Sequence, residues 1–282
     1  MFILDVVPLT NIPLGQSQIF SYFSKQDVKR GCLVEVSLNR RKVLATVLKS
    51  ENVISRKALI KKSDFALKPI TKIISSKPLM PPLFFILADF MARYYFCSTS
   101  MAIKTILPSR IKSLSKYLEK LPDEEFPEYF KITKPLASKE ILKRQKGNIF
   151  SNDFSFLIKE IKQCLSKKQQ VLILAPTVLH QQYYLDKIKT SLEETVHIAG
   201  SDLKVKEFND LWKKINNQKA LLIIGRRSAV FLPWQNLGLI IIIDSNNPAY
   251  KSWDQKPYHN AITLVNYLSL YYHVSIIEYQ NY

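Results

Sequence analysis

Two short apolar runs in the C-terminal half of the chain predict strands that are buried on both faces. They comprise residues 221–224 and 239–243, and each consists of leucine and isoleucine without polar alternation. Such continuous runs are typical of the inner strands of a parallel sheet. The second run is followed at once by polar residues, from Asp244 to Asn247. Because ligands bind at the carboxyl ends of parallel strands, a phosphate- or metal-handling group is expected here.

The first fifty residues show a different pattern, in which short apolar segments alternate with polar turns. Strands are predicted at residues 2–7, 19–23, 32–36 and 42–48. Strands at such close spacing favour a small antiparallel barrel or sheet. The turn between the last two strands contains Asn39, which tolerates a positive φ and can take the place of glycine there.

The remainder of the chain divides into an α/β region and a connecting segment. Apolar spacing predicts helices at residues 153–165, 204–216 and 261–270, and further strands at residues 171–176 and 274–277. Strands that alternate with helices are typical of a parallel sheet with helices on its faces. Residues 113–145 are charged and contain Pro122 and Pro127, which suits a linker. The predicted domains are therefore residues 1–112 and 146–282.

Positive charge is concentrated in the N-terminal part of the chain. The net charge is +18, and residues 1–112 carry 18 Lys and Arg against 6 Asp and Glu. A basic domain indicates a polyanionic partner, most often nucleic acid, although a lysine-rich proteome is the alternative explanation. The chain shows neither a signal peptide nor a membrane-spanning run, so we expect a cytoplasmic protein with no membrane partner. Its three cysteines, Cys32, Cys97 and Cys164, are widely spaced and suggest no zinc site.

The segment from residue 221 to 259 resembles a known family. The first helicase lobe of primosomal protein N′ (PriA), the bacterial replication-restart helicase, is matched without a gap by Ile224-Gly225, Arg227-Ser228-Ala229, Asn236-Leu237-Gly238-Leu239, Tyr250-Lys251 and Tyr258-His259. The resemblance implies a RecA-like α/β lobe. The same register places Ile243, Asp244, Ser245 and Asn246 where the family has Asp-Glu-Glu-His. Ile243 thus replaces the carboxylate that would hold magnesium.

The resemblance also places the family's phosphate loop at residues 147–154. A working loop needs small residues around the phosphates, a lysine to neutralise them and a hydroxyl to hold magnesium. Here Asp153 stands in place of the lysine and Phe154 in place of the hydroxyl. A carboxylate beside a phosphate changes an attraction into a repulsion. We therefore expect a degenerate nucleotide site at Gly147, Asp153, Phe154 and Asp244, with no cofactor, no metal and no catalytic residue.

The first domain resembles the 3′ DNA-binding domain of the same family. Its motifs are matched by Pro8-Leu9, Phe20-Ser21-Tyr22, Gly31, Val34, Val36, Leu67-Lys68 and the helical segment 79–108. Ser21 and Asn39 stand where the family has aspartate and glycine. In the family these loops and the lysine form a pocket for the last base and the 3′-hydroxyl of a DNA strand. The resemblance implies a related pocket in this chain.

Two interpretations remain open for several of these side chains. Phe20 and Tyr22 are two residues apart and share a face of the predicted strand, so they line either a DNA pocket or the core. Arg226 and Arg227 lie between two predicted strands, where they either contact phosphate or are solvated turn residues. The predicted DNA-binding residues are Phe20, Ser21, Tyr22, Asn39, Arg40, Arg41, Lys68, Arg226 and Arg227.

The predicted function is that of a non-catalytic DNA-binding protein of replication restart, which binds forked or 3′-ended DNA. It is not expected to be an enzyme, because the phosphate-loop lysine and the first acidic residue of the magnesium motif are replaced. One alternative is an ATP-dependent helicase lobe that a partner chain completes. Another is an adaptor that binds replisome or primosome proteins rather than DNA. The family's winged-helix module and second helicase lobe are expected to be absent.

Overall fold

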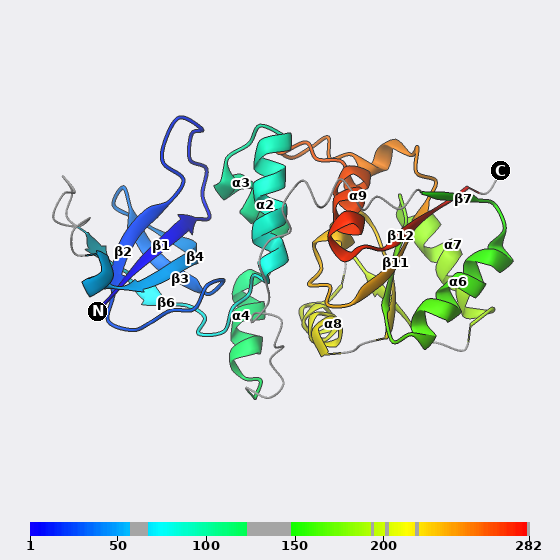
Figure 1. The fold of residues 1–282 in the computed structure, drawn as a ribbon, viewed down its shortest axis with the longest axis horizontal. Coiled ribbons are helices and arrows are strands. Elements are labelled where there is room, and N and C mark those ends of the chain that lie inside the picture. The colour runs from blue at the N-terminus through cyan, green and yellow to red at the C-terminus, as the bar shows by residue number, and fades with distance from the viewer. Residues whose placement is uncertain (57–66, 123–147, 193–194, 201–202, 218–219, 281–282) are drawn as a thin grey trace. The chain divides into compact units, whose positions relative to one another are not determined.

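The computed structural model describes residues 1–56, 67–122, 148–192, 195–200, 203–217 and 220–280. The chain divides into two units, Met1–Thr133 and Lys134–Tyr282. Within the described residues, each unit contains a six-stranded sheet (Figure 1). The predicted fold class is confirmed, because the first sheet is a curled half-barrel and the second is a parallel sheet covered by helices.

The first sheet consists of four antiparallel strands with a short strand at each edge. The long strands are β1 (Phe2–Pro8), β2 (Phe20–Ser24), β3 (Leu33–Leu38) and β4 (Arg41–Asn52), and the edge strands are β5 (Lys68–Pro69) and β6 (Lys72–Ile73). Their order is β5-β2-β1-β4-β3-β6, with β5 parallel to β2. One face is buried as an apolar core that includes Leu4, Val6, Tyr22, Val34, Val36, Ala45 and Val47.

The β3–β4 hairpin closes through a turn of two residues. Leu38 pairs with Arg41, which leaves Asn39 and Arg40 as the connection. Both have positive φ, 48° at Asn39 and 63° at Arg40, as a type I′ turn requires. The predicted positive φ at Asn39 is confirmed. Arg40 adopts the same left-handed conformation without the local hydrogen-bonding advantage that an asparagine has there.

Helices follow the sheet between residues 67 and 122. They are α2 (Pro82–Tyr94), α3 (Thr99–Ile106) and α4 (Ile111–Glu119). Helix α4 buries Leu114 and Leu118, and the Glu119 carboxylate accepts a hydrogen bond from the backbone N–H of Ser76 at 2.6 Å. The first unit therefore continues beyond residue 112, where the sequence predicts a domain end. Most of the predicted linker, residues 123–145, lies outside the described residues.

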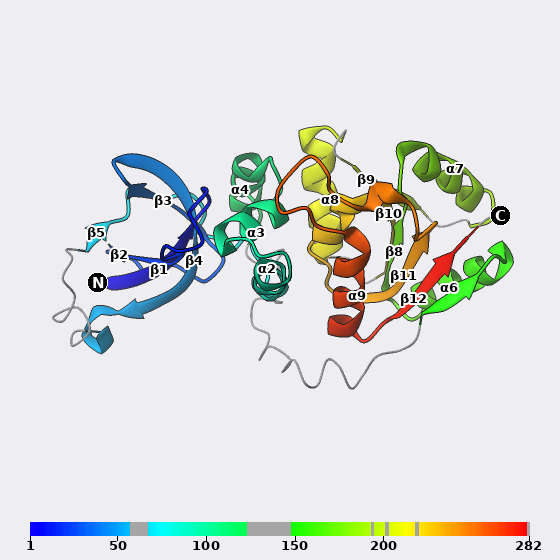
Figure 2. The ribbon, with the colours of Figure 1, turned by 90° about the horizontal axis from the view of Figure 1, so that it is seen from above.

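The second unit is a parallel sheet with helices on both faces. Its strands are β7 (Ile149–Ser151), β8 (Gln170–Leu174), β9 (Val196–Ala199), β10 (Leu221–Gly225), β11 (Leu237–Ile243) and β12 (Ser275–Tyr279), in the order β7-β12-β11-β8-β10-β9. Helices α6 (Phe154–Ser166) and α7 (Val178–Lys189) cover one face, and α8 (Val205–Asn217) and α9 (Ala261–Tyr272) cover the other (Figure 2). Every residue of β8 and β10 is buried, as the continuous apolar run in β10 predicts.

Candidate nucleic-acid interface and nucleotide site

Two aromatic side chains of β2, Phe20 and Tyr22, belong to the core of the first unit. Tyr22 is only 4% exposed, and its hydroxyl donates a hydrogen bond to the carbonyl oxygen of Ser37 at 2.9 Å. Burial raises the pKa of Tyr22 above its usual value. Phe20 is half-buried and packs against the same core. Of the two interpretations of Tyr22, these contacts favour the core, because its ring is covered and its hydroxyl ties β2 to β3 across the buried face.

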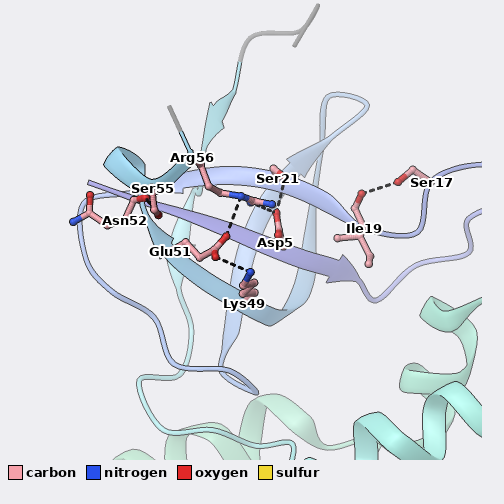
Figure 3. Close-up of polar contacts among 9 residues, drawn as sticks. All are labelled: Asp5, Ser17, Ile19, Ser21, Lys49, Glu51, Asn52, Ser55 and Arg56. Atoms are coloured by element: carbon pink, nitrogen blue, oxygen red, sulfur yellow. Dashed lines mark hydrogen bonds and ion pairs between the residues drawn. The ribbon is translucent and has the colours of Figure 1, made fainter. Parts of the chain in front are cut away.

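Ser21 belongs to a polar network on the other face of the sheet (Figure 3). Its hydroxyl donates to Oδ1 of Asp5, its cross-strand partner, at 2.6 Å. Nη1 of Arg56 donates to the same carboxylate oxygen at 2.8 Å, and Nε of Arg56 lies 3.0 Å from Oε2 of Glu51. Lys49 contacts the other oxygen of Glu51 at 2.6 Å. Two carboxylates and two cations thus neutralise one another, and Ser21 is held in place by them.

The network includes two residues that the sequence motifs do not indicate. Asp5 interrupts the apolar run of β1, and an isolated acid in such a run is the signal that could have singled it out. No feature of the sequence singles out Arg56, because it is 51 residues away from Asp5 in the chain and contacts it only in the folded protein. The hydrogen bond from Arg56 to Asp5 is the main cause that raises the pKa of the Arg56 guanidinium.

Exposed cations lie at the hairpin tip and along the β5 edge. Arg40, Arg41 and Lys42 are exposed where β3 turns into β4. Lys68 is exposed on β5 and stands in register with Tyr22 of the neighbouring strand β2. Exposed lysine and arginine side chains are suited to contact with phosphate groups. Lys68, Arg40 and Arg41 are thus accessible at the surface, whereas Tyr22 is not.

In the second unit, the connection that would hold a phosphate group is too short for a phosphate loop. Residues 149–151 form strand β7, and α6 begins at Phe154, so two residues connect them. The Asp153 carboxylate caps α6 by accepting a hydrogen bond from the backbone N–H of Ser155 at 2.8 Å. It therefore occupies the helix N-terminus, which is the part of the helix that would attract an anion. Gly147 lies outside the described residues.

Phe154 occupies its position as part of an aromatic cluster. Its ring lies edge-on to Tyr279, with centroids 6.3 Å apart, and Tyr279 is 5.8 Å from Tyr184 in the same geometry. Nζ of Lys187 lies 4.2 Å from the centroid of Phe154. Burial raises the pKa of Tyr184 to about 12, so this phenol stays protonated at neutral pH. Aromatic rings thus occupy the position at which a working phosphate loop would have a hydroxyl group to hold magnesium.

The end of β11 carries no carboxylate at the first position of the magnesium motif. Ile243 is 1% exposed and belongs to the core between the sheet and helices α6 and α7. Asp244 follows with a φ of 50°, and its Oδ2 accepts a hydrogen bond from Nδ2 of Asn247 at 2.8 Å. The hydroxyl of Tyr250 lies 2.8 Å from the carbonyl oxygen of Leu174 and 2.5 Å from that of Ile243, which fastens the turn to the sheet.

An open cleft of about 570 Å³ lies at this edge of the sheet. Its described lining consists of Leu179, His180, Tyr183, Tyr184, Ile243, Asp244, Asn246 and Gln280. Among these residues there is no lysine or arginine, and Asp244 supplies a carboxylate. A triphosphate needs cations and backbone N–H groups to neutralise it. The lining is therefore poorly suited to a nucleoside triphosphate.

Arg227, one of the two predicted arginines of the second unit, contacts the loop that follows β11. Nη1 of Arg227 donates to the carbonyl oxygen of Lys251 at 3.1 Å, and its Nη2 lies 3.4 Å from Oδ1 of Asp254. Lys251 in turn places its Nζ 4.0 Å from the centroid of Trp253, which is 64% exposed. Arg226 is half-buried. Arg227 thus holds the loop that follows β11, which is a positioning role the sequence did not predict.

Other chemistry has little support in the part of the chain that the structure describes. Burial raises the pKa of the Cys32 thiol to about 12 and that of Cys164 to about 11, so both are unreactive at neutral pH. No group of three His, Cys, Asp or Glu side chains is arranged to hold a metal ion among the described residues. None of the described helices has the length and apolar character needed to cross a membrane.

Comparison with known proteins identifies the class of the first unit. Residues 7–108 match the family model of the 3′DNA-binding domain (3′BD) of PriA. Along nearly its whole length the chain is similar to replication restart protein PriA, which confirms the resemblance seen in the motifs of both units. It is 28% identical to the protein of Helicobacter pylori strain 26695 over 282 residues, which cover 98% of this chain and 42% of that relative.

Two further relatives bear the same name. Replication restart protein PriA of Bacillus subtilis is 27% identical over 180 residues, which cover 57% of this chain and 22% of that protein. The protein of Chlamydia muridarum is 34% identical over 101 residues, which cover 36% of this chain and 13% of that protein. The chain spans less than half the length of these relatives.

Proposed function

We propose that this chain is a DNA-binding protein of replication restart that acts at forked or 3′-ended DNA in the cytoplasm without hydrolysing nucleotide. The observation that carries the proposal is the match of residues 7–108 to a 3′ DNA-binding domain. The same region holds most of the excess positive charge of the chain, with 18 Lys and Arg against 6 Asp and Glu in residues 1–112. Both features favour a polyanionic partner for the first unit.

The contact surface that we propose consists of the exposed cations of the first unit. Arg40, Arg41 and Lys42 project from the tip of the β3–β4 hairpin, and Lys68 lies on the β5 edge. These side chains would contact backbone phosphates, which position a nucleic acid without reading its sequence. Ser21 would keep a hydroxyl oxygen on the outer face, while Asp5 fixes its orientation. Tyr22 has no direct contact with DNA in this proposal.

Arg40→Gly is expected to stabilise the first unit while weakening its binding to DNA. Glycine adopts the φ of 63° freely, so relief at this position is worth about 1 kcal/mol in the free energy of unfolding. Loss of one phosphate contact makes the slope of log affinity against log salt less steep by about 1. Urea unfolding and fluorescence anisotropy at several salt concentrations measure the two effects.

Asn39→Gly is the matched control, because it relaxes the same turn and removes no charge. It should leave the salt dependence of DNA binding unchanged. If Arg40→Gly binds DNA as tightly as the natural chain and with the same salt slope, the hairpin tip is not part of the DNA surface.

The absence of nucleotide turnover is part of the proposal and rests on three positions. Asp153 caps α6 with a carboxylate, Phe154 lies in an aromatic cluster, and Ile243 is buried in the core. The second candidate function is an ATP-dependent helicase lobe completed by a partner chain. It is favoured by the parallel sheet itself, which keeps an open cleft at the carboxyl ends of its strands.

Millimolar MgATP is expected to leave the melting temperature of the chain unchanged. A ligand that binds the native state stabilises it by RT ln(1 + [L]/Kd), so saturation at one hundred times Kd would add about 2.7 kcal/mol. Differential scanning fluorimetry with and without MgATP and DNA measures the shift. A rise of several degrees, or DNA-stimulated release of phosphate, would support the helicase candidate and contradict the proposal.

An adaptor role for the second unit is the remaining candidate, and a surface feature favours it. Val178, Leu179 and Tyr183 of α7 are each more than half exposed, and large apolar side chains gathered on one helix are typical of protein-binding surfaces. Replisome or primosome proteins are the partners that the relationship to PriA suggests. This role and DNA binding by the first unit are compatible within one chain.

A further inference from the structure

The C-terminal end of α2 carries a phenylalanine at a position that favours glycine. The backbone N–H of Cys97 donates to the carbonyl oxygen of Ala92, the six-to-one bond of a Schellman motif. Phe96 is the left-handed residue of this motif and has a φ of 48°. Residues with a Cβ adopt this conformation at a cost, and bulky residues are rarely found in it. The backbone at this corner would be more favourable with glycine.

The ring of Phe96 does not offset that cost by burial. It is 86% exposed, and Tyr94 beside it is 56% exposed. Tyr94 stacks on Phe90 with centroids 5.3 Å apart and meets Tyr95 edge-on at 4.9 Å. We call these four residues, Phe90, Tyr94, Tyr95 and Phe96, the aromatic ledge. An exposed and strained aromatic residue on such a ledge indicates a contact made outside the unit's own core.

We infer that the aromatic ledge binds single-stranded DNA by stacking unpaired bases on its exposed rings. Binding of a single strand requires two parts: exposed flat rings on which bases stack, and a cationic surface that contacts the backbone. The first unit supplies the second part, since residues 1–112 carry 18 Lys and Arg against 6 Asp and Glu. This excess of cations favours a nucleic acid over an apolar protein segment as the occupant. The inference rests on the proposed DNA binding of the first unit and assigns it a second contact region.

The ledge also gives the first unit a preference that phosphate contacts cannot provide. Cations at the hairpin tip attract duplex and single strand alike, because both expose phosphates. Bases in a duplex are already stacked and cannot lie on a protein ring, whereas unpaired bases can. The ledge therefore makes the chain favour DNA with an unpaired segment.

The test compares the natural full-length chain with Phe96→Gly, using a fluorescein-labelled dT20 strand and a labelled blunt-ended duplex of two separate strands. Fluorescence anisotropy should show a loss of affinity for dT20 of about 5- to 160-fold, which is the range expected when one stacked base is lost. Affinity for the duplex should be unchanged, and the melting temperature of the protein should be equal or higher. Phe96→Tyr should bind dT20 as the natural chain does. Phe150→Ala, at a 72% exposed phenylalanine of the second unit, is the matched control and should change nothing.

Three results would overturn the inference. The first is unchanged dT20 affinity in Phe96→Gly. The second is an equal loss of affinity for dT20 and the duplex, and the third is a lowered melting temperature, which would assign the ring to packing. In each case the natural chain still binds DNA, so the proposed function survives. If the natural chain binds neither probe, the proposed function fails and this inference fails with it.

Discussion

Tyr22→Ala is expected to unfold the first unit rather than to weaken DNA binding alone. The ring is 4% exposed and packs in the core of the curled sheet, and its hydroxyl bonds to Ser37 across that face. Loss of a buried aromatic side chain costs about 3–5 kcal/mol in the free energy of unfolding. Tyr22→Phe removes only the hydroxyl and leaves one carbonyl without its partner, which costs about 1–2 kcal/mol.

Urea unfolding can follow the two units separately. All three tryptophans, Trp212, Trp234 and Trp253, lie in the second unit, so their emission reports that unit and serves as an internal control. Far-UV circular dichroism reports both units. The transition that Tyr22→Ala moves to lower urea concentration is then assigned to the first unit. A Tyr22→Ala chain of natural stability that has lost affinity for 3′ ends would contradict this assignment and favour the DNA-pocket interpretation.

Ile243→Asp, which restores the family's magnesium carboxylate, is expected to unfold the second unit instead of creating an ATPase. Ile243 is 1% exposed inside the core that joins the sheet to α6 and α7. A buried carboxylate without a partner costs about 3–5 kcal/mol, and the lost apolar packing adds to this. Asp153 and Phe154 would still occupy the phosphate and hydroxyl positions. Tryptophan emission during urea unfolding measures the loss of stability.

Ile243→Val is the control for packing alone. It removes one methylene group and should cost about 1 kcal/mol, with tryptophan emission reporting the same single transition. A well-folded Ile243→Asp chain that gains a melting-temperature shift with MgATP would show that the carboxylate reaches the cleft. A single substitution would then restore nucleotide binding, and the proposal that the nucleotide site is degenerate would be wrong.

The sequence predicted the second unit well because its signal is local. The runs at residues 221–224 and 239–243 lie in β10 and β11, where residues are buried from both faces. Their apolar character needs no tertiary context to be recognised. The turn at Asn39 was predictable for a similar reason, since a positive φ restricts the choice of residue at a single position.

The sequence could not decide which face of β2 is buried. Alternation places Phe20 and Tyr22 together and Ser21 opposite them, whichever side faces the core. The answer depends on the pairing of β2 with β1, which sets Ser21 beside Asp5, and on the reach of Tyr22 to Ser37. Both are contacts between distant segments. The family motif favoured a pocket, and the folded sheet assigns the tyrosine to the core.

The expected phosphate loop shows a different limit. Counting along the family motif places a loop at residues 147–154, but Ile149 and Phe150 extend a strand that pairs with β12. This apolar pair at the edge of the sheet forms ladder hydrogen bonds instead of wrapping a phosphate. At these motif positions the local structure differs from a phosphate loop as well as the chemistry. Alignment of the sequence with the family motif does not reveal such a change in structure.

The central claim is that the chain binds DNA through its basic first unit and needs no nucleotide to do so. Titration of the full chain with forked, 3′-ended and blunt DNA, at several salt concentrations and with or without MgATP, tests it most directly. We expect binding whose log affinity falls with log salt at a slope of about −3 to −5, as four to six phosphate contacts imply. MgATP should leave the affinity unchanged, and forked or 3′-ended DNA should bind more tightly than blunt DNA. No binding to any of the three, or binding that requires MgATP, would contradict the account.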